Sequence, residues 1–266
     1  MKSFLSGLAP AAVSLCVLCV LNANAVAADL VVGANIGNVP WEFQESSGEF
    51  VGFEIDLVKE VGARLGKSIE VVNIPFNGLF SAVQAGRIDI AVSSITITDK
   101  RLRSVAFVQP YYDSAQSLTV LSKNPARGLQ DMRGKVIGVD TGSTGDIWTT
   151  SNQAKYGYAE IRRFEGLASA MLDLQSGRLD GYISDIPSLE YFIRDKPYFK
   201  VIERIVTSEH YSMMFAKGSP LVTDVNEVIT ELKQEGYLAK LHESWFGSIP
   251  ADTSSTVTVA ELPALD

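Results

Sequence analysis

Arg101 and the residues just before it could together bind a carboxylate. Three hydroxyl side chains lie upstream of the arginine, at Ser93, Ser94 and Thr96. Thr98 is the expected N-cap of a helix whose first turn carries Arg101. A guanidinium beside free helix N–H groups can hold a carboxylate through two parallel, charge-assisted hydrogen bonds. The alternative is a solvated surface arginine, because other basic residues lie close by in the sequence.

A second copy of the sequence around this segment lies 91 positions further along the chain. Residues 83–89 and 174–180 share the pattern Gln-x-Gly-Arg-x-Asp, and the same offset places Asp185 at the position of Ser94. Two helix–Gly–strand units that end in polar side chains predict two similar α/β lobes with a ligand site at their strand ends. Asp185 could bind an ammonium group there, or it could serve only as a helix N-cap.

Residues 140–145, Asp-Thr-Gly-Ser-Thr-Gly, form a polar loop after another predicted strand. The loop lacks the lysine of a phosphate-binding loop, and Asp140 would repel a phosphate. Ser143, Thr144 and the N–H groups of the turn are better suited to hold the same carboxylate from the other lobe. An ordinary helix-capping loop is the alternative. A carboxylate receptor opposite the anion Asp185 predicts a site for the zwitterion of an α-amino acid.

Aromatic residues near predicted strand ends could form walls of this site: Trp41, Phe76 and Tyr112. The alternative for each of them is a place in the hydrophobic core. The two histidines, His210 and His242, have no obvious partners for a catalytic triad or a metal site. We therefore expect a binding protein without catalytic residues, metal or cofactor.

Apolar periodicity predicts an alternation of strands and helices along the chain. Strands are expected at 30–35, 69–74, 88–92, 105–108, 115–121, 135–139, 161–164, 179–183, 201–203 and 211–215. Helices are expected at 53–65, 79–85, from 147 onward, at 167–175, after Asp185, at 221–234 and at 238–245. This order predicts an α/β fold of mostly parallel sheets joined by crossover helices.

The chain is expected to pass between the lobes twice, near residues 114–117 and 209–212, which would form a hinge beside a cleft. Lobe 1 would comprise 29–115 and 212–249, and lobe 2 would comprise 116–211. Residues 250–266 are rich in Thr, Ser, Pro and acidic residues without periodicity, and we expect a disordered tail.

Residues 1–28 have the pattern of a secretory signal peptide. Lys2 precedes an apolar run, and small residues offer cleavage sites after Ala27 or Ala28. Both cysteines lie inside this segment, and each follows a leucine, which argues against lipidation. Cleavage would leave a cysteine-free chain whose net charge falls from −8 to −9, because Lys2 is lost and no acidic residue is. An acidic chain is poorly suited to nucleic acid or anionic membranes, so we expect an exported, soluble monomer.

Several motifs resemble a known family, the periplasmic solute-binding proteins of ABC importers in the polar-amino-acid group (solute-binding protein family 3). The similar segments span residues 30–247 and include Val51-Gly-Phe-Glu-Ile-Asp-Leu57, Phe76-Asn-Gly78, Gly86-Arg-Ile-Asp89, Ser94-Ile-Thr-Ile-Thr-Asp-Lys-Arg101, Pro110-Tyr-Tyr112, Gly134-Lys-Val-Ile-Gly-Val139, Gly177-Arg-Leu-Asp180 and Trp245-Phe-Gly247. The resemblance implies a two-lobed type II periplasmic-binding-protein fold, a periplasmic location, an amino acid ligand and a membrane permease as partner.

The resemblance also implies roles for individual residues. The residue that matches Arg101 holds the ligand α-carboxylate, with help from those that match Ser94, Thr96 and Thr144. The residue that matches Asp185 binds the α-amino group, and the one that matches Phe76 packs on the ligand side chain. These roles agree with the interpretation reached from the residues alone.

This sequence departs from the family pattern where the ligand side chain is recognised. Asn35 replaces a common Asp that helps to read the ligand side chain, and Asn38 replaces a frequent aromatic residue. Asp140 adds an acidic residue in the second lobe. The ligand is therefore expected to be a polar or basic L-amino acid, with a derivative such as an opine left open. The alternative function is a cyclohexadienyl-dehydratase-like enzyme, for which Asp140 would be the general acid.

Overall fold

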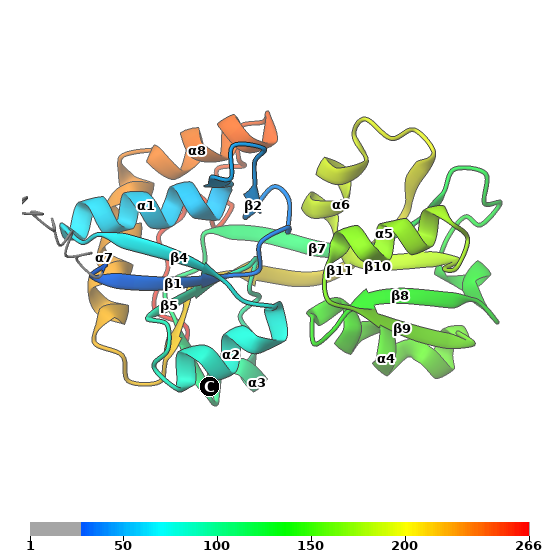
Figure 1. Cartoon of the computed structure of the whole chain (residues 1–266), viewed down its shortest axis with the longest axis horizontal. Coiled ribbons are helices and arrows are strands. Elements are labelled where there is room, and N and C mark those ends of the chain that lie inside the picture. The colour runs from blue at the N-terminus through cyan, green and yellow to red at the C-terminus, as the bar shows by residue number, and fades with distance from the viewer. Residues whose placement is uncertain (1–27, 266) are drawn as a thin grey trace, which may run out of the picture.

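The computed structural model describes residues 28–265, so the predicted signal peptide lies outside the described residues except for Ala28. The described chain forms two α/β lobes that lie side by side, and two long strands run from one lobe into the other (Figure 1). Each lobe contains a five-stranded sheet flanked by helices. Between residues 28 and 265, every helix is too short or too polar to cross a bilayer.

The lobe 1 sheet has the strand order β4-β1-β5-β12-β6. Its strands are β1 (Leu30–Ala34), β4 (Ile69–Asn73), β5 (Ile90–Val92), β6 (Val105–Phe107) and β12 (Met214–Ala216). A small hairpin joins β2 (Phe43–Gln44) to β3 (Phe50–Val51). The strands β4, β1 and β5 are parallel, as the alternating strands and helices predict, and β12 is antiparallel to its two neighbours.

Helices cover both faces of this sheet (Figure 1). The lobe 1 helices are α1 (Phe53–Leu65), α2 (Phe76–Gln84), α3 (Asp99–Leu102), α7 (Leu221–Gln234) and α8 (Tyr237–Phe246). One core lies between the sheet and α1, α7 and α8, and a second core involves α2. Helix α1 has the predicted bounds, because its apolar stripe faces the first core and Gly66 ends it with a left-handed φ of 65°.

The lobe 2 sheet has the strand order β11-β7-β10-β8-β9. Its strands are β7 (Tyr112–Leu121), β8 (Val136–Asp140), β9 (Glu160–Phe164), β10 (Gly181–Asp185) and β11 (Phe199–Tyr211). The lobe 2 helices are a short 3-10 helix (Leu129–Met132), α4 (Thr144–Tyr156), α5 (Leu167–Gln175) and α6 (Ile186–Ile193). The strands β10, β8 and β9 are parallel, and β7 is antiparallel to β10 and β11.

The internal repeat has the same structural role in both lobes. The repeat places β5 and β10 at the centres of the two sheets. The carboxylate of Asp89 accepts a hydrogen bond from the N–H of Val31 (2.8 Å), and that of Asp180 accepts one from Val136 (2.9 Å). Each repeated Asp therefore ties the central strand to the start of a neighbouring strand.

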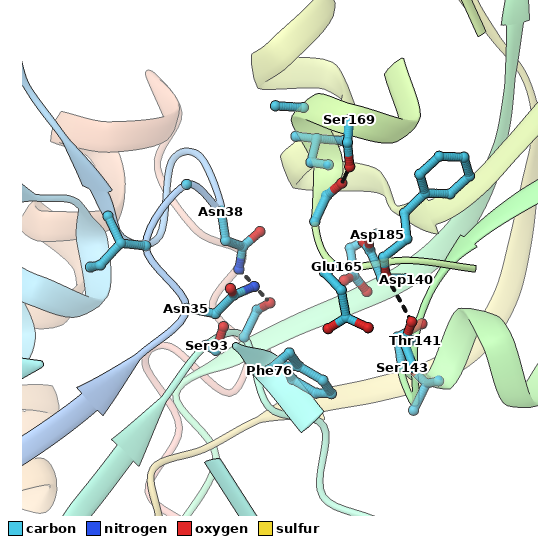
Figure 2. A pocket seen from close by; sticks show the side chains of 18 of the residues that line it. Asn35, Asn38, Phe76, Ser93, Asp140, Thr141, Ser143, Glu165, Ser169 and Asp185 are labelled. Atoms are coloured by element: carbon cyan, nitrogen blue, oxygen red, sulfur yellow. Dashed lines mark hydrogen bonds between the residues drawn. The ribbon is translucent and has the colours of Figure 1, made fainter. Parts of the chain in front are cut away.

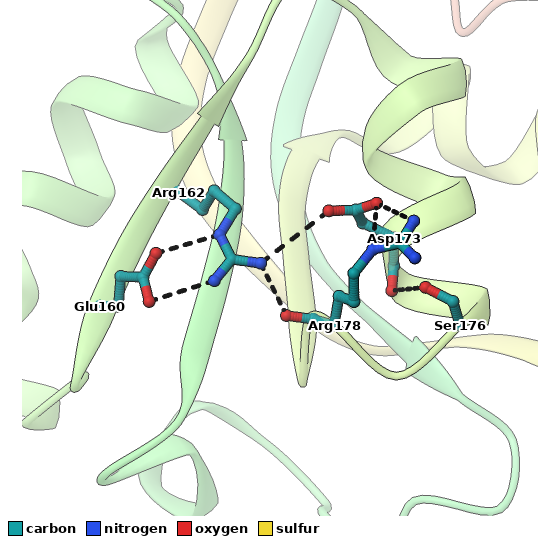
Figure 3. Close-up of polar contacts among 5 residues, drawn as sticks. All are labelled: Glu160, Arg162, Asp173, Ser176 and Arg178. Atoms are coloured by element: carbon teal, nitrogen blue, oxygen red, sulfur yellow. Dashed lines mark hydrogen bonds and ion pairs between the residues drawn. The ribbon is translucent and has the colours of Figure 1, made fainter.

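The repeated Arg178 belongs to a polar cluster on the surface of lobe 2 (Figure 3). Its guanidinium bonds to Asp173, and its main-chain oxygen accepts a hydrogen bond from Arg162 (3.0 Å). Arg162 in turn bonds to Glu160 through two nitrogen atoms. These groups are partly or fully exposed, so we assign the cluster to the joining of β9 and α5 rather than to ligand binding.

The two strands that link the lobes are longer than the sequence predicts. Strand β11 was expected to cover only 201–203 but extends over Phe199–Tyr211, paired with β7 along its length. Register shifts occur between Val201 and Glu203 and between Ile205 and Glu209. These irregularities interrupt the alternation of apolar and polar residues by which a strand is recognised in a sequence. Most of β11 was therefore not predicted.

In contrast to the expected disordered tail, the C-terminal segment (residues 250–265) is bonded to lobe 1 through several residues between 255 and 260. Thr256 is buried and donates a hydrogen bond to the oxygen of Tyr111 (3.0 Å), and the N–H of Ser255 bonds to Asp113 (2.8 Å). The segment lacks periodicity because it forms no helix or strand, and hydroxyl and backbone groups fix it instead. Composition alone therefore gave the wrong expectation for this segment.

Lys233 is central to this packing, and its side chain is only 5% exposed. Its ammonium donates to Gln109 Oε1 (2.8 Å) and to the main-chain oxygens of Pro110 (2.7 Å) and Thr258 (2.8 Å). Through these bonds, Lys233 connects helix α7 to the residues just before β7 and to the C-terminal segment.

We expect Lys233→Met to lower the free energy of unfolding by about 2–4 kcal/mol, because three buried oxygens lose a charged donor. Urea denaturation followed by tryptophan fluorescence would measure this loss. The matched control is Lys240→Met on the neighbouring helix, where the lysine is exposed and the expected change is near zero. Equal stabilities of the two variants would show that the lysine does not hold the segment.

Candidate functional site

A cavity of about 260 Å³ lies between the two lobes. Strand ends from both sheets line it, which agrees with the expected position of a ligand site in open α/β sheets. Figure 2 shows side chains from the two lobes that face each other across it. Of the predicted site residues, the cavity is lined by Asn35, Phe76, Ser93, Ser94, Thr96, Arg101, Asp140, Ser143, Thr144 and Asp185.

Arg101 lies in the first turn of α3, as the sequence predicts, and Thr98 caps that helix by accepting a hydrogen bond from the Arg101 N–H (3.2 Å). The arginine is only 8% exposed. Its guanidinium donates to the main-chain oxygens of Thr96 (2.7 Å) and, across the cleft, Gly142 (3.4 Å). These two bonds leave N–H groups of its five-donor fork for a ligand carboxylate.

Aromatic rings and distant acids surround the Arg101 charge. Its guanidinium carbon lies 5.5 Å from the ring centre of Phe76 and 5.1 Å from that of Phe80. Burial lowers the pKa of Arg101 to about 10, and Glu209 and Asp185 oppose the shift. The group therefore remains positively charged at neutral pH. The interpretation as a solvated surface arginine is wrong.

The loop after β8 presents a helix N-terminus to the cavity. Ser143 is the N-cap of α4, and its hydroxyl accepts a hydrogen bond from the Asp146 N–H (3.0 Å). The helix begins at Thr144, three residues before the predicted start, so free N–H groups of its first turn lie close to Gly142, which Arg101 contacts. Arg101 and this helix end thus offer donors to a carboxylate from opposite lobes.

Asp185 ends β10 at the N-cap position of α6, but its side chain makes no capping bond. The carboxylate instead accepts a hydrogen bond from Gln116 Nε2 (2.6 Å), and the same nitrogen lies 3.0 Å from both carboxylate oxygens of Glu209. Glu209 also accepts from the Thr96 hydroxyl (3.1 Å). Burial, followed by the nearby Glu209 charge, raises the pKa of Asp185 well above its usual range. A ligand ammonium would relieve this repulsion.

A second pair of carboxylates lies on the lobe 2 side of the cavity. Asp140 ends β8 and pairs with Phe164 at the end of β9, so Glu165 follows at the same edge of the sheet. Figure 2 shows Glu165 pointing into the space between the lobes, toward Phe76. Both acids line the cavity.

Asp140 is the more deeply placed of the two. Its Oδ2 accepts a hydrogen bond from the hydroxyl of Tyr182 (2.6 Å), whereas its buried Oδ1 has no partner among residues 28–265. Burial raises the pKa of Asp140 to about 6, the Tyr182 hydroxyl opposes the shift, and the Glu165 charge adds to it. The carboxylate is therefore mostly ionised at neutral pH but takes up a proton in mild acid.

Apart from Arg101, the side chains of the lobe 1 wall, which line the cavity, are uncharged. Asn38 donates to the Ser94 hydroxyl (3.1 Å) and to Glu42 Oε1 (3.0 Å), which also accepts from Ser93 (2.7 Å). Ser94 has a positive φ of 45°, a conformation that its N–H bond to Glu54 (2.9 Å) helps to hold. Glu42 and Glu54 are fully buried beneath this wall, which their hydrogen bonds support, and the burial raises both pKa values.

Trp41 does not line the cavity, in contrast to the prediction. It is fully buried and packs edge-on against Phe53, Tyr112 and Tyr211. Its indole N–H donates to the Ser188 hydroxyl on α6 (3.0 Å), so it forms a contact between the lobes. Tyr112 is also a buried member of this aromatic cluster. A position near a strand end does not tell which way a side chain points. The large Trp41 ring is buried in the core instead of facing the cavity.

Sequence reasoning missed three residues that shape the site. Glu165 directly follows a strand end, as Ser93 does, so the same rule could have found it. Gln116 and Glu209 lie within the two hinge strands and approach each other only because β7 and β11 are paired. Local sequence carries no signal for that contact. Within residues 28–265, no group of His, Cys, Asp and Glu is arranged to hold a metal ion.

Comparisons with known proteins find relatives that match most of this chain. A probable histidine-binding protein of Neisseria gonorrhoeae is 28% identical over 81% of this chain and 82% of its own length. The arginine-, lysine-, histidine-binding protein ArtJ of Geobacillus stearothermophilus has a TM-score of 0.78 and 31% identity, covering 84% of this chain and 97% of that one. An ancestral arginine-binding protein bound to arginine has the same TM-score and 31% identity, covering 82% and 98%.

The solved neighbours share the two-lobed fold and confirm the predicted fold class. Residues 30–248 match one family along almost the whole described chain. The chain thus belongs to the bacterial extracellular solute-binding proteins, family 3.

Proposed function

We propose that this protein is an extracytoplasmic receptor that binds an L-amino acid between its lobes and delivers it to the permease of an ABC importer. The observation that carries the proposal is the placement of opposite charges in one cavity. Arg101 and the N-terminus of α4 offer donors to a carboxylate, and Asp185 offers an acceptor to an ammonium group. The two charged groups attached to the α-carbon of an amino acid require this pair of partners.

The partners of the zwitterion come from different lobes. Arg101 belongs to lobe 1, whereas Asp185 and Thr144 belong to lobe 2. A ligand that contacts both would favour the conformation in which the lobes lie close together. The relatives named for histidine, arginine or lysine binding support an amino acid as the ligand class.

We expect Arg101→Ala and Asp185→Asn each to weaken amino acid binding at least about 100-fold, because each removes a charge-assisted contact from a buried site. Isothermal titration calorimetry on protein stripped of ligand by unfolding and refolding would measure the affinities. Arg103→Ala is the matched control, since Arg103 is exposed and should leave the affinity unchanged. Binding of unchanged strength in the Arg101 variant would refute the assigned role of Arg101.

The contact between Trp41 and Ser188 joins the lobes next to the cavity, and the Ser188 hydroxyl also donates to Asn38 (3.2 Å). We expect Ser188→Ala to weaken ligand binding about 3- to 10-fold, mainly through faster dissociation, because the closed form loses these bonds. Stopped-flow fluorescence would give the rate constants, with the exposed Ser176→Ala as control. A lower melting temperature of the ligand-free protein without any change in affinity would show that the contact also persists in the open form.

The raised pKa of Asp140 gives a specific reason to test a dehydratase activity on the same scaffold, since a general acid works best near its pKa. The Tyr182 hydroxyl already donates to this carboxylate, however, and the position facing Asp185 suits an ammonium group better than a leaving group. We expect prephenate and arogenate to remain unconsumed over hours. Turnover that Asp140→Asn abolishes would establish the enzyme instead.

A further inference from the structure

The charges that line the cavity exceed what a neutral amino acid can balance. Among the described residues that line it, three are acidic (Asp140, Glu165 and Asp185) and one, Arg101, is basic. The α-carboxylate and α-ammonium groups of a ligand would pair with Arg101 and Asp185. Asp140 and Glu165 would then remain as two carboxylates that line the cavity and pair with neither charge of the ligand backbone.

The two remaining carboxylates are close neighbours on one edge of lobe 2. Parallel strands lie ~4.8 Å apart, and Glu165 directly follows the residue that pairs with Asp140 across β8 and β9. The Glu165 charge acts on Asp140, as expected for neighbouring groups. One positively charged group could therefore contact both.

The nearest arginine on the same strand is already engaged. Arg163 on β9 bonds to Asp146 of α4 (2.8 Å) and to the Thr150 hydroxyl (2.9 Å). Tyr182, which bonds to Asp140, is a neutral donor, and it leaves the buried Oδ1 without a partner among residues 28–265. No cationic side chain that the structure describes in lobe 2 is therefore bonded to Asp140.

Among the described residues, the lobe 1 side of the cavity offers no acidic side chain that could select a cationic ligand; the acids that line the cavity all belong to lobe 2. Asn35 and Asn38 line lobe 1, and both are neutral amides. The acids on that side, Glu42 and Glu54, are buried beneath the wall and bonded to Ser93, Ser94 and Asn38. Phe76 offers an aromatic face that suits an alkyl chain or a planar cation.

We propose that Asp140 and Glu165 bind the positively charged end of the ligand side chain, so that lobe 2 makes this receptor selective for cationic amino acids. The inference rests on the proposed function and names its ligand class. It assigns side-chain recognition to lobe 2, whereas the lobe 1 wall with Asn35 provides neutral polar contacts.

The test compares L-arginine with L-citrulline, which has nearly the same shape and no side-chain charge. Calorimetry on stripped protein at about pH 7.5 should show that the wild type prefers arginine by about 10- to 100-fold, the effect of one charge-assisted contact. Glu165→Gln and Asp140→Asn should each reduce this ratio, and the double variant should bring it close to one. Citrulline affinity should change little in each variant.

Glu160→Gln is the matched control, because Glu160 begins the same strand at its far end and lies on the surface. It removes the same charge from lobe 2 and should keep the wild-type ratio. Glu165 is exposed, so Glu165→Gln should fold even if the change at the buried Asp140 disturbs the lobe. Melting curves of the ligand-free variants would confirm their folding.

A second readout uses pH. Protonation of Asp140, whose pKa is raised to about 6, removes a negative charge below that pH, so the arginine-to-citrulline ratio should fall between about pH 7.5 and pH 5. Protonation of Asp185 affects the α-ammonium group of both ligands and largely cancels in the ratio. The Asp140→Asn variant should show a flatter dependence on pH.

The possible outcomes separate the two proposals. Loss of preference in the Glu165 and Asp140 variants, with the control unchanged, would support the lobe 2 site. Equal wild-type affinity for the two ligands, or a ratio that the variants leave unchanged, would overturn it while the amino acid receptor stands. Absence of binding of any L-amino acid to the stripped wild type would instead overturn the proposed function itself.

Discussion

The site depends on one buried positive charge that the protein itself neutralises only in part. Arg101 bonds to main-chain oxygens of Thr96 and Gly142, one from each lobe, while Asp185 and Glu209 act on it from further away. A buried cation is costly unless a counter-charge approaches it closely. Helix α3, its Thr98 cap and the α4 N-terminus hold the surrounding donors in place. A ligand carboxylate would complete the electrostatic balance and join the lobes through the same contact.

Besides Asp185 and Glu209, two further pairs of acidic residues lie near the cavity in different surroundings. Glu42 and Glu54 lie beneath the lobe 1 wall, where burial raises their pKa values and where hydroxyl, amide and N–H donors surround them. They therefore organise Asn38, Ser93 and Ser94 without exposing charge to the cavity. Asp140 and Glu165 instead line the cavity in lobe 2. The protein thus presents a neutral polar wall together with Arg101 on one side, and negative charge on the other.

The sequence was informative wherever a local pattern has a local physical cause. Helix α1 ends at Gly66, Thr98 caps α3, and the repeat maps β5 onto β10, because periodicity, caps and glycine conformations act within a few residues. It was uninformative where distant segments meet. The length of β11, the contact between Gln116 and Glu209, the burial of Trp41 and the packing of the C-terminal segment all depend on tertiary pairing. Glu165 lies between these cases: it directly follows a strand, which is a local signal, but its place beside Asp140 depends on the pairing of β8 with β9.

The two copies of the repeat show how one architecture yields complementary chemistry. Asp89 and Asp180 make the same structural hydrogen bond, so the strands that follow reach the cleft in equivalent positions. At positions 94 and 185, which the repeat makes equivalent, the copies differ: Ser94 is a neutral hydroxyl on the side of Arg101, whereas Asp185 is a carboxyl group. Lobe 1 therefore offers Arg101 to the carboxylate of a zwitterion, whereas lobe 2 offers Asp185 to its ammonium group and the α4 N-terminus to its carboxylate. A ligand held by both sets of partners would gain its full free energy of binding only when the two lobes lie close together.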